Sequence, residues 1–134
     1  MEQSTTCKYR MVMIIDDNEI DRYVGESVIK MHHFAEAVIN VEAGKDALEY
    51  LTAHQDQPDL LPQLIFLDIN MPEMNGFEFL EEYKNLPDSI KTNCIVMMLT
   101  TSLHDEDKQK AETCEYVYRF LNKPLNPEKL NSMP

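Results

Sequence analysis

The polar residues that could take part in chemistry each follow a short apolar run. Asp16 and Asp17 follow the first run, and Asp68, Thr100 and Lys123 follow three later ones. Carboxylates gathered in one cleft would repel each other and raise one another's pKa. A hard divalent cation relieves this repulsion, and magnesium prefers oxygen ligands, often one or two carboxylates plus waters. We therefore expect a magnesium site if the fold brings these residues together.

A carboxylate beside such an ion can also act as a nucleophile. It can attack phosphorus and form an acyl phosphate, while the metal and the Lys123 ammonium neutralise charge on the transferring oxygens. Thr100 can donate a hydrogen bond to a phosphoryl oxygen. Taken singly, each residue has a plainer interpretation, with Asp17 as a helix cap, Thr100 as a turn residue and Lys123 as a solvated cation. Their shared position after apolar runs favours the chemical interpretation.

The elements that must position these residues alternate between apolar runs and amphipathic stretches. Uninterrupted apolar runs are typical of buried strands in a parallel sheet. They predict strands over residues 11–15, 37–41, 64–67, 94–99 and 116–121. Between them, apolar residues at helical spacing or a polar, helix-prone composition predict helices over residues 18–33, 44–54, 77–83 and 105–113. In the first of these helices the recurring apolar residues are Ile20, Val24, Val28 and Met31.

A last helix is predicted after Pro124, with Asn126 as its N-cap and Pro127 at its first position. Strands and helices then alternate along the whole chain as a (βα)5 repeat. This predicts an α/β doubly wound sandwich, in which a five-stranded parallel sheet is covered by helices on both faces. Ligands bind beyond the carboxyl ends of the strands in such folds, which is where the polar residues described above would lie.

The chain is predicted to form one domain over residues 10–134, preceded by a flexible leader at residues 1–9. Its 134 residues, 43% of them hydrophobic, suffice for a real hydrophobic core. Residues 55–63 and 85–93 are predicted to be polar connections that contain proline. The last helix has room only for residues 127–133, so it is expected to be short or truncated.

Composition limits the partners to be expected. Lys and Arg total 12 against 24 Asp and Glu, which gives a formal net charge of −12. Such a chain is repelled by phosphate backbones and anionic lipids, so neither direct nucleic-acid binding nor membrane binding is expected. No apolar run is long enough to span a bilayer, and residues 1–10 are polar, unlike a signal peptide. A cytoplasmic location is therefore the default expectation.

Four stretches of the sequence together resemble the response-regulator receiver domains, the family of CheY-like chemotaxis proteins. They occur in the family's order and cover the chain from about residue 11 to residue 130. The second stretch is highly specific, whereas the Lys-Pro pair of the fourth would be weak evidence by itself. The stretches are Ile14-Ile-Asp-Asp-Asn18, Phe66-Leu-Asp-Ile-Asn-Met-Pro-Glu-Met-Asn-Gly76, Met98-Leu-Thr-Thr-Ser102 and Leu121-Asn-Lys-Pro124.

The resemblance implies a flavodoxin-like sheet with strand order 2-1-3-4-5 and a phosphorylation site at Asp68. It implies that Mg²⁺ is held by Asp17, Asp68 and the backbone carbonyl of Asn70, with Asp16 contributing through water. It gives Lys123 the role of the cation that contacts the phosphoryl group. These assignments place one metal ion and one phosphoacceptor in a single site.

Further roles follow from the same resemblance. Thr100 corresponds to the switch hydroxyl and Phe120 to the switch aromatic, while Pro72 and Gly76 match the turn after the phosphorylation site. The segment before the last strand is one residue longer than usual, which leaves Thr101 as an alternative switch residue. The apolar run that ends at Leu99 favours Thr100. The peptide bond between Lys123 and Pro124 is expected to be cis.

The function implied is that of a phosphoacceptor in a two-component phosphorelay. A sensor histidine kinase or a histidine phosphotransfer protein would supply the phosphoryl group, and the domain would change shape to signal to an output partner or to form a phosphorylation-dependent homodimer. Only self-catalysed transfer and loss of the phosphoryl group is expected, not enzymatic turnover. The alternatives are a magnesium-dependent phosphatase that forms an aspartyl phosphate, and a degenerate receiver that serves only as an interaction module.

Overall fold

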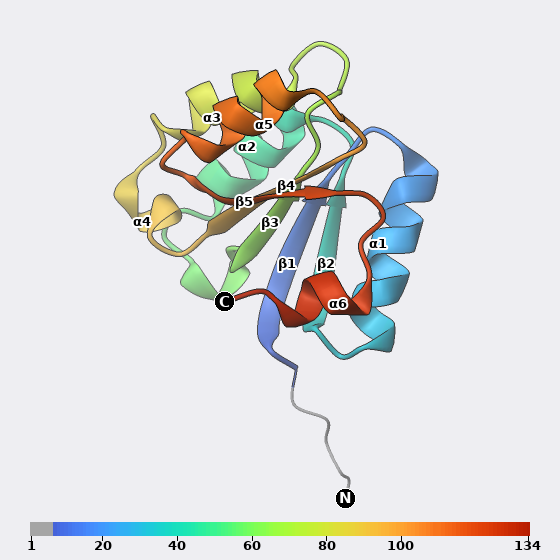
Figure 1. Cartoon of the computed structure of the whole chain (residues 1–134). Coiled ribbons are helices and arrows are strands. Elements are labelled where there is room, and N and C mark those ends of the chain that lie inside the picture. The colour runs from blue at the N-terminus through green and yellow to red at the C-terminus, as the bar shows by residue number, and fades with distance from the viewer. Residues whose placement is uncertain (1–6) are drawn as a thin grey trace, which may run out of the picture.

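The computed structural model describes residues 7–134, and within them a parallel β-sheet forms the centre of the domain (Figure 1). Its five strands are β1 (Tyr9–Ile15), β2 (Ala35–Val41), β3 (Leu64–Leu67), β4 (Ile95–Thr100) and β5 (Val117–Asn122). They are ordered β2-β1-β3-β4-β5. The predicted α/β doubly wound sandwich with its flavodoxin-like strand order is confirmed.

The first strand begins two residues earlier than the apolar run predicted. Tyr9 pairs with Ala35 across the parallel ladder, and its backbone N–H donates to the Phe34 carbonyl at 2.9 Å. Its ring also packs on the Phe34 ring, with centroids 5.1 Å apart. Tyr9 therefore belongs to β1 and not to the predicted leader, of which residues 1–6 lie outside the described part of the chain.

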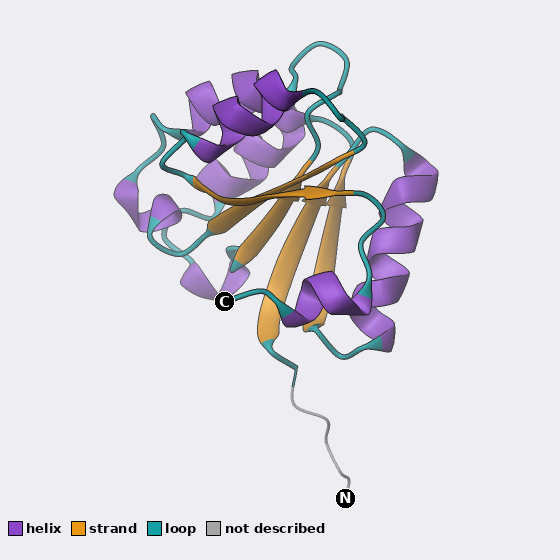
Figure 2. Cartoon of the chain, viewed as in Figure 1, coloured by secondary structure: helices purple, strands orange, loops and turns teal. Residues whose placement is uncertain are grey.

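Helices cover both faces of the sheet (Figure 2). One face carries α1 (Glu19–Met31) and α6 (Pro127–Asn131), and the other carries α2 (Gly44–Ala53), α3 (Gly76–Tyr83) and α5 (Asp105–Glu112) (Figure 1). The last helix starts as predicted, because the Asn126 side chain accepts a hydrogen bond from the Lys129 N–H. No helix within residues 7–134 is long and apolar enough to cross a bilayer.

Helix α1 packs on the sheet through Val28 of its predicted apolar repeat and through two residues outside that repeat. Gly25 and Ile29 are its buried positions, and Gly25 lies against the Ile14 side chain of β1. Ile20 and Met31 are each 72% exposed instead. The absence of a Cβ at Gly25 lets the helix approach the sheet closely, so the contact face centres on a residue that a hydrophobic repeat does not reveal.

The two connections predicted to be polar and to contain proline also contain single helical turns. A 3₁₀ turn, η1, covers Pro58–Leu60, and helix α4 covers Asp88–Lys91. In α4 the preceding Pro87 has φ −57°, which suits the start of a helix, and Ile90 is fully buried. A single buried side chain therefore anchors a turn that is too short to show helical periodicity.

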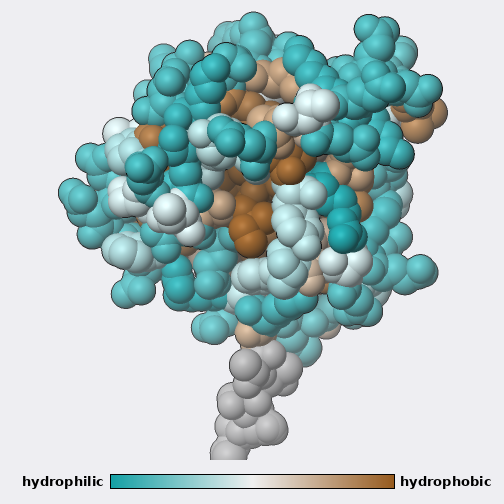
Figure 3. Space-filling view, turned by 60° about the vertical axis from the view of Figure 1, so that its left-hand side comes forward, coloured by the Kyte–Doolittle hydropathy of each residue, from teal (hydrophilic) through white to brown (hydrophobic). Residues whose placement is uncertain are grey.

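The sheet separates two hydrophobic layers. Met13, Ile65 and Met98 face α2, α3 and α5, whereas Ile14, Phe66 and Leu99 face α1 and α6. This alternation follows from the two-residue period of side chains along a strand. Outside these layers the surface is largely polar, and Figure 3 shows a mostly hydrophilic face with hydrophobic residues gathered in a hollow near its centre.

The start of α3 is pressed against the end of β3. Asn75 caps the helix by accepting from the Glu78 N–H at 2.8 Å, and the Glu78 carboxylate accepts from the Asn75 N–H at 2.9 Å. The next residue, Gly76, donates its N–H to the Ile69 carbonyl at 2.8 Å. A Cβ at Gly76 would lie only 2.5 Å from the backbone oxygen of Asp68. Gly76 therefore allows the helix to support the backbone of Asp68.

We expect Gly76→Ala to destabilise the protein by about 1–3 kcal/mol, because backbone atoms cannot move aside for the added methyl group. Gly25→Ala is the matched control. Its Cβ would meet only the end of the Ile14 side chain, at 3.1 Å, and alanine favours a helix interior over glycine by about 1 kcal/mol. Urea denaturation should show a loss for Gly76→Ala and little change or a gain for Gly25→Ala. Equal losses would contradict this account of Gly76.

Candidate functional site

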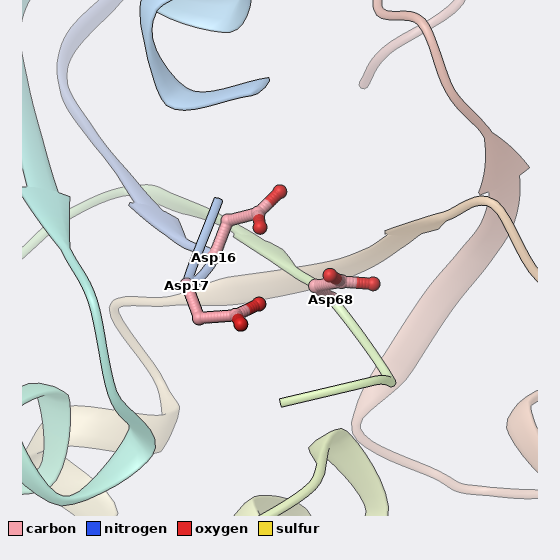
Figure 4. A group of neighbouring side chains, drawn as sticks. All are labelled: Asp16, Asp17 and Asp68. Carbon is pink, nitrogen blue, oxygen red and sulfur yellow. The ribbon is translucent and has the colours of Figure 1, made fainter. Parts of the chain in front are cut away.

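Asp16, Asp17 and Asp68 meet at the carboxyl edge of the sheet (Figure 4). Each offers a carboxylate oxygen, and these oxygens all lie within 4.8 Å of one another. Asp16 is 4% exposed and Asp68 is 6% exposed, while Asp17 is open to solvent. The structure thus brings together the three carboxylates that the sequence singled out.

The sheet ladder fixes the backbone of both buried aspartates. The Asp16 N–H donates to the Val41 carbonyl, and the Asp68 N–H donates to the Ile15 carbonyl, each at 3.0 Å. Strand β1 lies between β2 and β3, and all three are parallel. Asp16 and Asp68, which directly follow β1 and β3, therefore continue the hydrogen-bond pattern of the sheet. The side chains are held as well, because Asp16 accepts from the Asn18 N–H at 2.9 Å and Asp68 accepts from the Ile69 N–H at 2.8 Å.

Lys123 brings a positive charge into contact with the carboxylates of the site. It follows β5, and its N–H donates to the Thr100 carbonyl at 2.9 Å. Its Nζ lies 2.6 Å from Asp16, 2.7 Å from Asp21 and 3.3 Å from Asp68. The peptide bond that joins Lys123 to Pro124 is cis, as expected. A lysine that is only 10% exposed in its side chain is therefore surrounded by carboxylates.

The electrostatics of the site reflect this arrangement. Burial raises the pKa of Asp16, and hydrogen bonds from Lys123 and from the Asn18 N–H oppose that effect only in part. Burial alone would lower the pKa of Lys123, but hydrogen bonds to Asp16 and Asp21, together with the charge of Asp68, raise it above its ordinary value. The surrounding carboxylates therefore favour the charged form of Lys123, whereas burial disfavours the charge of Asp16.

Thr100 is the last residue of β4 and is fully buried, while Thr101 is exposed just beyond the strand. The Thr100 hydroxyl oxygen accepts a hydrogen bond from the Ser102 N–H at 3.2 Å. Phe120 is half-buried on β5, where it pairs with Met98. Because Thr100 follows Met98 by two residues, Thr100 and Phe120 lie on the same face of the sheet.

Asn70 lies two residues after Asp68 in the connection to α3, and its side chain is exposed. Sequence reasoning placed only its backbone carbonyl in the metal site. Pro72 and Gly76 continue the same connection, which ends where Gly76 packs on Asp68. The predicted turn after Asp68 is therefore present, and it leads directly into α3.

Sequence reasoning missed Asp21 and Ser102. Asp21 is an acid in the first turn of α1, where the positive end of the helix dipole is a sufficient explanation of its charge. Ser102 is buried and donates its hydroxyl hydrogen to Asp107 at 2.6 Å, and its carbonyl accepts from the Asn122 side chain at 2.9 Å. Neither residue carries a local signal of a role at the site, because their partners lie on other elements.

Residues 12–133 match the protein family described as the response regulator receiver domain. The chain belongs to this family. The receiver domain is 30% identical over 121 residues to the probable methanogenesis regulatory protein FilR2 of Methanothrix harundinacea, an alignment that covers 90% of this chain and 76% of that protein. Most of the domain is thus shared with a regulatory protein.

Solved structures agree with this assignment. A two-component response regulator from Cytophaga hutchinsonii superposes on the receiver domain with a TM-score of 0.84 and 33% identity, covering 91% of both chains. The Mn(2+)-bound form of response regulator Rcp1, a protein of Synechocystis, gives a TM-score of 0.72 at 28% identity and covers 90% of this chain and 86% of that one. This chain is a receiver domain of the two-component type.

We expect Mg²⁺ to raise the melting temperature of the protein, because a ligand that binds only the folded state stabilises it by about 2.7 kcal/mol at a hundredfold excess over Kd. Asp17→Ala should abolish most of the rise. Asp56→Ala is the control, since Asp56 is an exposed acid in the connection before β3. If Asp17→Ala is stabilised by Mg²⁺ as strongly as Asp56→Ala, the metal site has been assigned wrongly.

Proposed function

We propose that this receiver domain accepts a phosphoryl group on Asp68 with Mg²⁺ bound beside it, and that the modified domain signals through a change of shape. The observation that carries the proposal is the position of Asp68. Its carboxylate is buried at the end of a central strand, within 4.8 Å of the oxygens of Asp16 and Asp17 and 3.3 Å from the Lys123 ammonium. A nucleophile, a metal ion and the Lys123 ammonium would thus act together on one phosphoryl group.

The donor set fits magnesium. Asp17, Asp68 and the backbone carbonyl of Asn70 would hold the ion, and Asp16 would contribute through water. All of these are oxygen donors, which hard divalent cations prefer. The Mn(2+)-bound form of Rcp1 supports a divalent cation in this fold. When bound, the ion would neutralise charge on the phosphoryl oxygens. It would also neutralise charge on Asp16, Asp17 and Asp68, whose carboxylates lie close together.

Asp68 is the best-placed nucleophile among the three carboxylates. Asp16 is committed to Lys123 at 2.6 Å and to the Asn18 N–H, and Asp17 is open to solvent. Asp68 is held less tightly by Lys123, at 3.3 Å, and one of its oxygens is fixed by the Ile69 N–H. This leaves Asp68 oriented, while its other oxygen, held only by the longer contact with Lys123, can turn toward phosphorus.

The transfer follows from these roles. An Asp68 oxygen attacks the phosphorus of a phosphohistidine on a sensor histidine kinase or a histidine phosphotransfer protein. The new O–P bond forms as the P–N bond breaks, and the leaving imidazole nitrogen keeps the electron pair and takes up a proton. Lys123 would stabilise the charge on the transferring oxygens. Loss of the group to water would regenerate the Asp68 carboxylate.

The signal would leave the site through Thr100 and Phe120. A phosphoryl group adds charge and strong hydrogen-bond acceptors, and the Thr100 hydroxyl would donate to one of its oxygens. To reach that oxygen Thr100 would move toward Asp68. Its movement would leave space that Phe120, on the same face of the sheet, could fill. The surface around β5 would change for an output partner, or for a second copy of the domain in a phosphorylation-dependent homodimer.

Two alternative functions would use the same domain. A phosphatase that forms an aspartyl phosphate would share the metal and the nucleophile, and multiple turnovers on a generic phosphomonoester would favour it. A degenerate receiver would serve only as an interaction module. The complete set of Asp16, Asp17, Asp68, Thr100 and Lys123 argues for phosphoryl transfer, because an interaction module does not need a buried nucleophile beside a cation.

Asp68→Asn should abolish labelling by a small phosphodonor such as acetyl phosphate in the presence of Mg²⁺. The substitution keeps the shape of the side chain but removes the nucleophilic oxygen. Intact-mass measurement should show one added phosphoryl group on the parent and none on Asp68→Asn. Asp88→Asn, at an exposed position in α4, should label like the parent. A phosphoryl adduct that persists in Asp68→Asn would refute the assignment of the acceptor.

Thr100→Ala should uncouple the site from β5. With Mg²⁺ and beryllofluoride, a mimic of the phosphoryl group, NMR signals around Phe120 should shift in the parent and largely fail to shift in Thr100→Ala. Thr101→Ala removes a hydroxyl from the neighbouring exposed position and should behave like the parent. The opposite result for the two variants would transfer the switch role to Thr101.

A further inference from the structure

The Lys123 ammonium is held by a carboxylate that lies outside the group of candidate metal ligands. Asp21, in the first turn of α1, accepts a hydrogen bond from Lys123 Nζ at 2.7 Å. The ammonium is closer to Asp21 than to Asp68, which lies at 3.3 Å. Asp21 is also separate from the carboxylates that gather within 4.8 Å of each other, namely Asp16, Asp17 and Asp68.

We propose that Asp21 is a positioning residue that competes with Asp68, and with a phosphoryl group on Asp68, for the Lys123 ammonium. This inference rests on the proposed phosphoacceptor function. In the resting domain Asp21 draws the ammonium toward α1. The phosphoryl oxygens must draw it back before Lys123 can stabilise the modified state.

The hydrogen-bonding capacity of Lys123 is the basis of the competition. An ammonium group has three donors, and the three nearest carboxylates, from Asp16, Asp21 and Asp68, account for them. A phosphoryl group offers several strong acceptor oxygens at one point. Water can replace the ammonium at Asp21, whose side chain is 35% exposed, but not at Asp16, whose side chain is 5% exposed, so the donor directed at Asp21 is the one most available to be redirected.

Both ends of the Asp21–Lys123 pair are fixed by the fold. The Asp21 N–H donates to the Asn18 side chain at 2.9 Å, and Gly25 and Ile29 anchor α1 to the sheet. On the other side, the Lys123 backbone is tied to Thr100. The ammonium can therefore change partner by rotation of the flexible lysine side chain, without movement of either backbone.

The surroundings leave the ammonium few alternatives. A cavity of about 100 Å³ adjoins Lys123, Asp16 and Asp21, and its other walls include the apolar side chains of Ile14 and Leu99. A charged group does not move into such a space without a polar partner. An ammonium that leaves Asp21 must therefore move toward Asp68 and the edge of the sheet.

The test uses beryllofluoride with Mg²⁺ as the probe. Asp21→Asn keeps the size of the side chain but removes its charge, so the ammonium should shift toward the adduct on Asp68. Asp21 is 35% exposed in its side chain, and partly exposed ion pairs are weak. We therefore expect the probe to bind about two- to fivefold more tightly, the range that corresponds to such a pair. The ¹⁹F signals of the bound probe should also shift.

Two controls separate positioning from a general effect of charge. Glu19→Gln removes one negative charge from the same turn of α1, and Glu19 is exposed and not among the carboxylates that hold Lys123. It should change the affinity and the ¹⁹F signals much less than Asp21→Asn. In a Lys123→Gln background, Asp21→Asn should have no effect on affinity, because the ammonium through which it acts is gone.

The possible outcomes are distinct. If Asp21→Asn binds the probe like the parent, or no more tightly than Glu19→Gln, the positioning role is overturned while the phosphoacceptor function stands. If its effect persists in the Lys123→Gln background, Asp21 acts through charge and not through Lys123, and the inference is likewise overturned. If the parent itself forms no adduct, the proposed function fails and the inference fails with it.

Discussion

Burial of negative charge is the constraint on which the site depends. Asp16 and Asp68 lie almost out of reach of solvent, and removing a carboxylate from water is costly unless a partner compensates for it. Lys123, which follows the edge strand β5, supplies that compensation to both carboxylates with one positive charge. The site therefore keeps an excess of negative charge, which suits the binding of a divalent cation.

The sheet topology makes this concentration of charge possible. Parallel strands place all of their carboxyl ends on one edge, and the order β2-β1-β3-β4-β5 puts β1 beside β3 in its middle. The residues that follow these two strands are thereby brought together, and hydrogen bonds from the ladder fix their backbones. Helix α3 completes the support, since Gly76 lets it rest on the backbone of Asp68.

Much of this arrangement could be predicted from the sequence, because strong signals coincide in it. The buried strands are uninterrupted apolar runs, and the polar residues of the site stand where those runs end. The single turn of α4 could not be predicted, since four residues show no periodicity. Nor could the exposure of Ile20, because the contact of α1 with the sheet depends on Gly25.

Asp21 shows a different limit of sequence reasoning. An acid in the first turn of α1 is explained by the favourable interaction of negative charge with the N-terminal end of a helix. Its contact with Lys123 joins residues that are 102 positions apart in the chain. A pattern confined to a short window cannot reveal such a pair, because only the folded sheet brings the two side chains together.

The separation of the site residues along the chain also affects when the site can form during synthesis. The carboxylates of β1 emerge from the ribosome first, while the cation that balances them lies beyond β5. Contacts between such distant residues form late in folding, because closing a long loop costs entropy before the contact repays it. An incomplete nascent chain would expose its aspartates without the lysine. The site thus holds its full set of charged side chains only when the last strand is in place.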